Sequence, residues 1–433
     1  MKILHCLHQY HPATGGAEWL MKNVSERLAA AGHEVRVVAS NAYSVEDYFV
    51  SGKGKKRMRT GEEVVDGIPV RRVPFTRRGA ALLNLARAAA NRLPLPFGDR
   101  LRMLSWGPRG RAYEREIERA VRAGEADIVV ACPLPTLNIY YAWKAARRMA
   151  VPFVMVPCFH TEDKFTFYNR IYFRMMRDAA AVICLTEHEM RFLQNATGAP
   201  EKVFHVLGAG IDVQGVTDRE GAWEGCSARS ENKARATASE IRQKYGIGER
   251  DFVLFLGQHA LHKGIIPLIE AVRTVWREKP DVGLVIAGNP TAHTRDIEAH
   301  IRGLAAEEQR RIHLIGKFQE AEKRAIMAAC RVFVSVSPFE SFGIVFLEAW
   351  REKRPVIGCR RGASSRIIDE FRDGLLVPDH DPRTLAGAII EVLEDESRAT
   401  LMGEAGFRKV AARYSWDNII ARWEKVYESV LQG

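Results

Sequence analysis

The sequence contains no apolar run long enough to cross a membrane. Its longest apolar runs, Ala179–Leu185 and Val332–Val336, have the length of strands, whereas a membrane-spanning helix needs about 20 residues. The first residues also lack the features of a secretory signal, because the apolar stretch is short and leads into glycines instead of a cleavage site. We therefore expect a cytoplasmic protein whose first residues form a buried strand.

Cysteines are few and scattered. Seven occur, and none is spaced as C-x-x-C, so neither a zinc site nor a disulfide framework is expected. No Asp-x-Asp pair stands in an obvious metal-site context, and we expect no metal and no cofactor. A hydrophobic content of 47% and a charged content of 27% exclude a largely disordered chain. A length of 433 residues suggests two or three domains.

Acidic residues are scarce in one segment. Between Arg71 and Arg122 there are 13 arginines against four acids, a net charge of +9, while the whole chain carries +11. This surplus favours an anionic partner, and residues 80–103 fit an amphipathic helical pair lying on an anionic membrane surface. The alternative is a helical pair that covers the first sheet and exposes its arginines to solvent. The arginines do not interleave with aromatics, so no nucleic-acid partner is expected.

Short apolar runs alternate with helical patterns in two series. Such alternation predicts an α/β protein with two doubly wound, Rossmann-like domains that face each other across a ligand-binding cleft. The expected strands of the first series are Ile3–Leu7, Val35–Ala39, Ile128–Ala131, Phe153–Val156, Ala181–Leu185 and Val203–Val206. Those of the second are Phe252–Leu256, Val282–Ala287, Ile312–Ile315, Val332–Val336, Pro355–Gly358 and Leu375–Val377.

A polar stretch with weak periodicity, Val213–Glu240, separates the two series and is interpreted as a linker or inserted loop. The expected domains are residues 1–209 and residues 210–415. A final helix over 416–433 follows both. Tyr43–Asp66, which contains a run of basic residues, is expected to be a loop.

Two glycine-containing turns follow predicted strands. Gly15 and Gly16 follow the first strand and open a helix, where the backbone can approach a ligand closely and the amides attract phosphate. Gly257 ends a later strand, and Lys263 stands six residues further on, where its ammonium group can meet phosphate oxygens. In the alternative interpretation, Gly15 and Gly16 form an ordinary strand-to-helix turn, and Lys263 is a solvated loop lysine.

The segment from Ser337 to Trp350 carries two carboxylates. Glu348 stands in an apolar run, and a buried carboxylate needs hydrogen-bond donors, which sugar hydroxyls supply in pairs. Glu340 precedes the same helix, and the amides of Phe342–Ile344 would face a phosphate placed at its start. In the alternative interpretation, Glu340 is a helix N-terminal charge and Glu348 pairs with Arg351 or Lys353.

Taken together, these motifs resemble the retaining, metal-independent glycosyltransferases of family 4, which have the GT-B fold. The resemblance spans nearly the whole chain. It rests on Glu340-x7-Glu348 around Phe342-Gly343, the turn Gly15-Gly16-Ala17-Glu18, the strand entry Gly32-His33-Glu34-Val35, Lys263-Gly264 and Gly374-Leu375-Leu376-Val377. It implies that the N-terminal domain binds an acceptor, that the C-terminal domain holds a nucleotide-diphosphate-sugar donor, and that the final helix packs back on the N-terminal domain.

The resemblance also implies roles for individual residues. His160 would lie near the reacting sugar, Lys263 would stabilise the departing diphosphate, and Glu340 would bind donor-sugar hydroxyls, so that these three are the candidate catalytic residues. Gly15 and Gly16 would contact the acceptor. The expected donor-binding residues are Gly16, Gly257, Gln258, Lys263, Glu340, Phe342, Gly343, Ile344, Val345 and Glu348, the last on the ribose. Two positions depart from the family pattern: Gln258 replaces the usual Arg, and Arg366 replaces a frequent Glu.

The activity implied by the resemblance is transfer of a sugar to a glycan or lipid-linked acceptor, in surface polysaccharide or glycolipid synthesis. The expected course is a front-face attack with retention of configuration, in a cleft that closes by a hinge near Gly208–Asp212. The expected location is the cytoplasm, with peripheral contact to the inner membrane face through Arg71–Arg122 as an open alternative. A non-catalytic nucleotide-sugar-binding protein and a nucleotide-sugar epimerase are the competing hypotheses.

Overall fold

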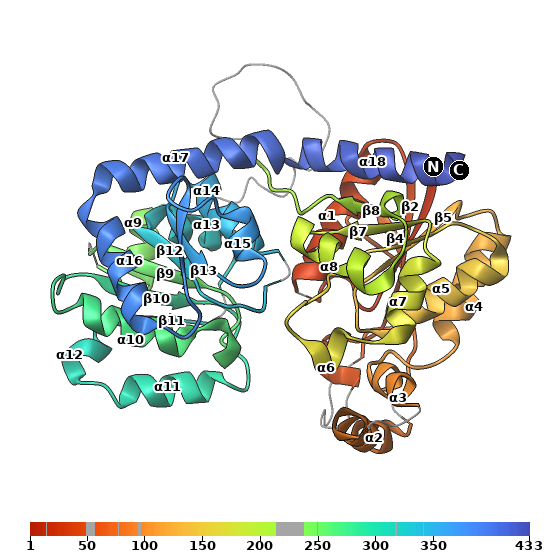
Figure 1. Ribbon diagram of the computed structural model, residues 1–433, viewed down its shortest axis with the longest axis horizontal. Coiled ribbons are helices and arrows are strands. Elements are labelled where there is room, and N and C mark those ends of the chain that lie inside the picture. Colours follow the sequence, from red (N-terminus) through yellow and green to blue (C-terminus); the bar gives the residue numbers. More distant parts are fainter. Residues whose placement is uncertain are drawn as a thin grey trace. The chain divides into compact units, whose positions relative to one another are not determined.

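A computed structural model describes residues 1–13, 15–48, 57–76, 78–93, 97–213, 238–248, 250–316, 318–340 and 342–433. The chain forms two compact units, Met1–Gly210 with Asp417–Gly433, and Ile211–Trp416. Each unit is a mainly parallel sheet with helices on its faces (Figure 1), which confirms the predicted α/β class. Residues 214–237 of the expected linker lie outside the described residues.

The first unit is built on an eight-stranded sheet in the order β3-β4-β2-β1-β5-β6-β7-β8. Except for the edge strand β3, its strands are mostly buried and β-branched residues are frequent in them, as is typical of a sheet covered on both faces. The strands are β1 (Lys2–Leu7), β2 (Glu34–Ser40), β3 (Gly61–Val65), β4 (Ile68–Val73), β5 (Ile128–Cys132), β6 (Phe153–Met155), β7 (Ala181–Cys184) and β8 (Phe204–Val206).

Strand β3 corrects the prediction of a loop over Tyr43–Asp66, of which residues 49–56 lie outside the described residues. Strands β3 and β4 form an antiparallel hairpin in which Val65 pairs with Ile68, and β4 then continues the sheet parallel to β2. The turn residues Asp66 and Gly67 both have positive φ, 47° and 80°, as a two-residue hairpin turn requires. The Asp66-Gly67 pair is typical of a hairpin turn, but the basic residues that precede it favour a loop.

Helices flank the first sheet, and the last helix of the chain belongs to this unit. Trp423 and Tyr427 of α18 (Trp416–Gln432) are fully buried, and His33 pairs with Glu424 at 2.9 Å. The other helices are α1 (Gly16–Ala30), α2 (Ala80–Arg92), α3 (Gly98–Ser105), α4 (Ala112–Arg122), α5 (Leu137–Met149), α6 (Lys164–Phe167), α7 (Arg170–Arg177) and α8 (Glu187–Thr197), with 3₁₀ turns η1 (Val45–Tyr48) and η2 (Glu201–Val203).

The second unit has a six-stranded parallel sheet in the order β11-β10-β9-β12-β13-β14. Its strands are β9 (Phe252–Leu256), β10 (Gly283–Ala287), β11 (Ile312–Ile315), β12 (Val332–Ser335), β13 (Val356–Cys359) and β14 (Gly374–Val377). Its helices are α9 (Ala238–Lys244), α10 (Ile265–Val275), α11 (Thr294–Arg302), α12 (Ala306–Gln309), α13 (Glu320–Ala329), α14 (Ile344–Arg351), α15 (Ser364–Ile367), α16 (Pro382–Glu394) and α17 (Glu396–Arg413), with the 3₁₀ turn η3 (Leu261–Lys263).

Helix α9 shortens the expected linker Val213–Glu240, because its first three residues are helical and not linker. Ile241 anchors this helix with 1% of its surface exposed, and Lys244 pairs with Glu322 of α13. No helix among the described residues has both the length and the apolar character needed to span a bilayer.

Candidate functional site

The candidate donor site lies at the carboxyl edge of the second sheet, where loops leave β9, β12 and β13. Three tight contacts hold these loops together. Gly264 adopts φ +78°, and a side chain on it would lie 2.8 Å from Val336. Ser337 Oγ donates a hydrogen bond to the carbonyl oxygen of His262 at 3.1 Å. A Cβ on Gly362 would lie 2.4 Å from the Pro338 oxygen, so only glycine allows this approach.

This packing brings Lys263 and Glu340 into contact although 77 residues separate them. Lys263 ends η3, and its Nζ donates to Glu340 Oε1 at 2.6 Å. The two side chains are 19% and 18% exposed, so the pair is reachable by a ligand but mostly shielded from water. The structure therefore joins two groups that the sequence analysis had assigned separately, one to the diphosphate and one to the sugar.

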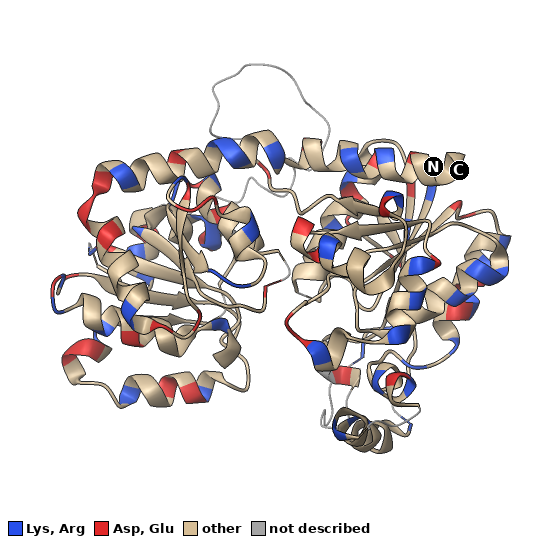
Figure 2. Cartoon of the chain, in the orientation of Figure 1, with Lys and Arg blue, Asp and Glu red and all other residues tan. Residues whose placement is uncertain are grey.

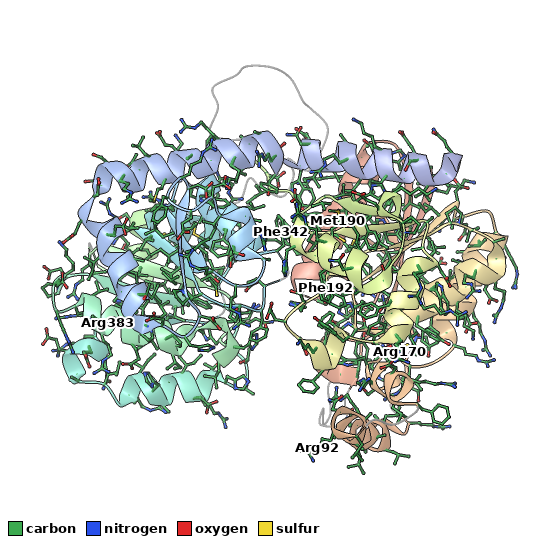
Figure 3. All side chains as sticks on the ribbon, in the orientation of Figure 1. Arg92, Arg170, Met190, Phe192, Phe342 and Arg383 are labelled. Carbon is green, nitrogen blue, oxygen red and sulfur yellow. The ribbon has the colours of Figure 1, made fainter. Side chains whose placement is uncertain are left out.

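The glycine before α14 places a helix N-terminus beside this pair. Gly343 has φ +89°, and a Cβ there would lie 2.7 Å from the Phe346 ring. Phe342, labelled in Figure 3, is buried. Its ring packs edge-on against Tyr414 with ring centroids 5.7 Å apart. Ile344 and Val345 form the first turn of α14, where backbone amides have no partner within the helix and attract anions.

Glu348 lies one turn into α14 and is 4% exposed. Its Oε1 accepts a hydrogen bond from Lys323 of α13, so its partner is neither Arg351 nor Lys353. Among the described residues, its buried Oε2 has no hydrogen-bond partner. A buried oxygen of this kind is costly unless a donor reaches it, and a ribose hydroxyl is such a donor. Lys323 is a site residue that the sequence analysis missed, because no local motif marks its contact with a helix 25 positions away.

Gly257 and Gln258 follow β9 at the same edge. The backbone at Gly288, just after β10, lies so close to Gly257 that a Cβ on Gly288 would be 1.6 Å from the Gly257 oxygen. Gln258 is exposed. Arg366, the second departure from the family pattern, is also exposed, on the short helix α15.

The sequence does contain one Asp-x-Asp pair, at Asp379 and Asp381, and both carboxylates are engaged. Asp379 pairs with Arg361 at 2.8 Å. Asp381 caps α16 by accepting from the amides of Arg383 and Thr384. These contacts assign the two aspartates structural roles.

The remaining candidates belong to the first unit. Gly16 opens α1 after β1, and a Cβ on it would meet no atom within 4 Å, whereas one on Gly15 would lie 2.3 Å from Glu18. Burial raises the pKa of Glu18, but the adjacent His8 outweighs it and leaves that pKa below its usual value. The His8–Glu18 pair, at 2.8 Å, was not foreseen from the sequence.

His160 follows β6 in the first unit. Its ring packs against Phe167 with centroids 5.0 Å apart, and its surface is half-buried. The site residues thus fall into two groups: Gly15, Gly16 and His160 in the first unit, and Gly257, Gln258, Lys263, Glu340, Phe342, Gly343, Ile344, Val345 and Glu348 in the second.

Comparisons with known proteins cover both units. Residues 15–210 match the family described as "Glycosyl transferase 4-like domain", and residues 237–409 match "Glycosyl transferases group 1". The chain belongs to the family 4 glycosyltransferases of the GT-B fold. Its family membership thus agrees with the resemblance inferred from the motifs.

Two curated relatives illustrate the range of similarity. A GDP-mannose-dependent alpha-(1-6)-phosphatidylinositol monomannoside mannosyltransferase from Mycobacterium tuberculosis is 29% identical over 198 residues, 43% of this chain and 50% of the relative. The chain therefore spans about half the length of that relative. A phosphatidyl-myo-inositol mannosyltransferase from Mycolicibacterium smegmatis is 25% identical over 427 residues, 96% of this chain and 90% of the relative.

Solved structures share the fold across nearly the whole chain. Anabaena HepE, crystallised with UDP and glucose, aligns with a TM-score of 0.71 at 18% identity, covering 99% of this chain and 100% of that one. Sucrose-phosphate synthase from Thermosynechococcus elongatus aligns with a TM-score of 0.69 at 18% identity, covering 99% and 98%. At this level of identity the alignments establish the fold.

Proposed function

We propose that the chain transfers a sugar from a nucleotide-diphosphate-sugar to a hydroxyl group of a glycan or lipid-linked acceptor. The observation that supports this most directly is the grouping at one sheet edge of the Lys263–Glu340 pair, the N-terminus of α14 and the orphaned oxygen of Glu348. These groups suit the three parts of such a donor: the diphosphate, the sugar and the ribose.

The chemistry of the proposed transfer follows from where charge develops. As the bond between the anomeric carbon and the phosphate oxygen breaks, negative charge builds on the diphosphate. Lys263 and the amides of Ile344 and Val345 would stabilise that charge in place, without a metal ion. The acceptor oxygen then bonds to the anomeric carbon from the same face, and its proton passes to the departing phosphate, so that configuration is retained.

We place His160, Gly15 and Gly16 on the acceptor side of this reaction. Of these three residues, Gly16 has the best structural support as a ligand contact. The space beside its Cα is open, and it lies at the N-terminus of a 15-residue helix. Glu340, once its ammonium partner turns to the diphosphate, is available to accept hydrogen bonds from sugar hydroxyls. Gln258 would offer an amide where the family usually places a guanidinium.

We further propose that the enzyme works at the cytoplasmic face of an anionic membrane. The relatives named above act on phosphatidylinositol and its mannoside, and lipid substrates lie at a membrane surface. Helices α2 and α3 lie at the end of the first unit opposite α18 (Figure 1), and α2 carries basic but no acidic residues (Figure 2).

The structure narrows the basic segment to a smaller surface than the sequence suggested. Several of its arginines are paired: Arg71 with Glu116, Arg72 with Glu63, Arg102 with Asp99, Arg119 with Glu116 and Arg122 with Glu118. We define the α2–α3 surface by its exposed apolar residues Leu82 (71%), Leu85 (70%), Leu93 (57%) and Phe97 (70%) and its exposed Arg78, Arg92 and Arg100. Arg92 is the last residue of α2 and is labelled in Figure 3. Exposed apolar side chains flanked by arginines are typical of interfacial helices.

Sugar transfer is tested by incubating the purified chain with UDP- and GDP-sugars, with and without phospholipid acceptors. We expect nucleoside diphosphate release that depends on the acceptor, and a glycosylated product with the anomeric configuration of the donor. Conversion of the donor sugar to an epimer without acceptor would instead establish the epimerase. Tight donor binding with no chemistry over hours would establish the non-catalytic binding protein.

Membrane contact is tested by co-sedimentation with vesicles of anionic or neutral phospholipid. We expect binding to anionic vesicles at low salt and its loss in the double variant Leu82→Ser/Leu85→Ser. Leu401→Ser is the matched control, since Leu401 is 61% exposed on α17 of the other unit. Equal binding by all three proteins, or none by the wild type, would refute the membrane proposal and leave the transfer proposal intact.

A further inference from the structure

Among the residues that the structure describes, Arg109 is a buried arginine without a charged partner. It lies between α3 and α4 and is 8% exposed. Its Nη1 donates to the Leu104 oxygen at a long 3.5 Å, and among the described residues its shielded Nε and Nη2 have no hydrogen-bond partner. Four of the five N–H donors of a guanidinium belong to Nη1 and Nη2 and one to Nε, so most of its bonding capacity is unused.

The contrast with Arg72 shows that this is unusual within the same unit. Arg72 is 2% exposed, and its Nε donates to Glu63 at 2.6 Å while Nη1 and Nη2 donate to the carbonyls of Tyr10 and His11. A buried guanidinium is normally satisfied in this way. Burial lowers the pKa of Arg109, and the nearby Tyr141 partly opposes this shift.

The segment that carries Arg109 lies against the carboxyl edge of the first sheet. The Arg109 oxygen accepts from the amide of Thr76, just past β4, at 2.8 Å. The Gly107 oxygen accepts from the amide of Leu137, at the start of the helix after β5. The Tyr141 hydroxyl accepts from the Gly110 amide at 3.2 Å. Ligands of doubly wound domains bind at this edge, so an unsatisfied cation here stands where an acceptor would enter.

We propose that Arg109 binds a phosphate group of the acceptor. A phosphate offers oxygens that a guanidinium can engage bidentately, and it supplies the countercharge that no carboxylate in the described part of the chain provides. The side chain meets the ligand by rotating about its own bonds, with the Tyr141 hydroxyl as a neighbouring donor. This inference rests on the proposed function for the ligand's role as acceptor, while the phosphate site itself is independent of catalysis.

The first experiment measures thermal unfolding of the wild type, Arg109→Met and Arg100→Met with and without inorganic phosphate. Arg100 is an exposed arginine of α3 and serves as the matched control. Without phosphate, we expect Arg109→Met to melt about 2–4 °C higher, since it removes an uncompensated buried charge. With phosphate, the wild type and Arg100→Met should gain stability and Arg109→Met should not. An unchanged phosphate response in Arg109→Met, or none in the wild type, would overturn the proposal.

Two further measurements separate the possible explanations. Phosphate can also bind the donor site, so the titration is repeated with Lys263→Ala: a response that disappears in Lys263→Ala but survives in Arg109→Met would overturn the assignment. If Arg109→Met does not fold, Arg109→Gln is used in its place. Failure of both variants to fold would show that Arg109 is needed for folding and would also overturn the proposal.

The source of the phosphate is resolved by two ligands. Soluble inositol 1-phosphate and vesicles containing phosphatidylinositol are compared for binding to wild type and Arg109→Met. A loss of at least tenfold in affinity for one of them in Arg109→Met identifies a free sugar phosphate or a lipid headgroup as the ligand. Equal affinities of the two proteins for both would refute the proposal. Binding, not turnover, is measured, so an inactive enzyme does not affect the result.

Discussion

Replacing Lys263 with alanine should separate catalysis from folding. The substitution removes the ammonium group that donates to Glu340 at 2.6 Å. If that group also stabilises the departing diphosphate, its loss costs about 3–4 kcal/mol in the transition state, by analogy with removing one oxyanion donor, and lowers kcat about 10²- to 10³-fold.

The effect on the fold should be much smaller. Both side chains of the pair keep nearly a fifth of their surface exposed, so we place the loss of stability between about 1 kcal/mol for an exposed pair and about 3 kcal/mol for a buried one. A protein of ordinary stability, about 5–15 kcal/mol, then remains more than nine-tenths folded at 25 °C. Loss of activity cannot then arise from unfolding.

The assay combines initial rates of nucleoside diphosphate release with urea unfolding. Lys279→Ala is the matched control, because Lys279 pairs with Glu394 at 3.3 Å on the surface of the same unit. We expect it to keep full activity. Turnover within a factor of three of wild type in Lys263→Ala would refute the role assigned to Lys263, and an equal loss in Lys279→Ala would show that the effect is not specific to the site.

Three further predictions test the donor site, the helix turns and the buried histidine. Glu348→Gln should bind UDP or GDP at least about tenfold more weakly by calorimetry, because ribose hydroxyls lose a charged acceptor; unchanged affinity would remove Glu348 from the site. Gly264→Ala should lower the melting temperature, since φ at this position is +78° and the new Cβ would lie 2.8 Å from Val336. Gly16→Ala should leave the melting temperature unchanged, because its new Cβ would meet no atom within 4 Å. If a ligand occupies that space, Gly16→Ala should lower the rate of sugar transfer. Burial lowers the pKa of His5 from 6.5 to about 3. As the pH falls below 6.5, His5 therefore becomes protonated in the unfolded chain but stays neutral in the folded chain. Wild type should therefore lose stability relative to His5→Asn by about 1.4 kcal/mol per pH unit between pH 6 and 4, and parallel pH profiles in urea unfolding would contradict this.

Much of the fold was predictable because strands buried in a parallel sheet are marked by local sequence. All twelve expected strands correspond to strands in the structure, since each is a short apolar run bounded by glycine or polar residues. Strands β3 and β4 were missed because β3 is an exposed edge strand, with Val64 72% exposed, and such a strand has no apolar run to mark it. Only its Asp66-Gly67 turn distinguishes it from a loop.

The candidate site was predictable in its residues but not in its contacts. The sequence marks Gly264, Gly343 and the nearby carboxylates, because glycines that permit left-handed turns and charged residues within apolar runs can be recognised without a structure. The pairing of Lys263 with Glu340 depends on how closely two neighbouring strand ends approach. The contact of Lys323 with Glu348 depends on the packing of α13 against α14, and neither leaves a trace in local composition.

The sequence by itself determined the α/β alternation, the positions of the tight turns and the residue types available to bind a phosphorylated sugar. These follow from interactions within a few residues: burial periodicity, backbone strain at glycine and helix-end charge. Only the tertiary structure decided which charges are neutralised. One segment contains 13 arginines. Folding pairs several of them with acids and leaves Arg109 buried, with no hydrogen-bond partner for its Nε and Nη2 among the described residues. The reason is physical: electrostatic and hydrogen-bond energies depend on distance and burial, which are fixed by packing between segments far apart in the chain.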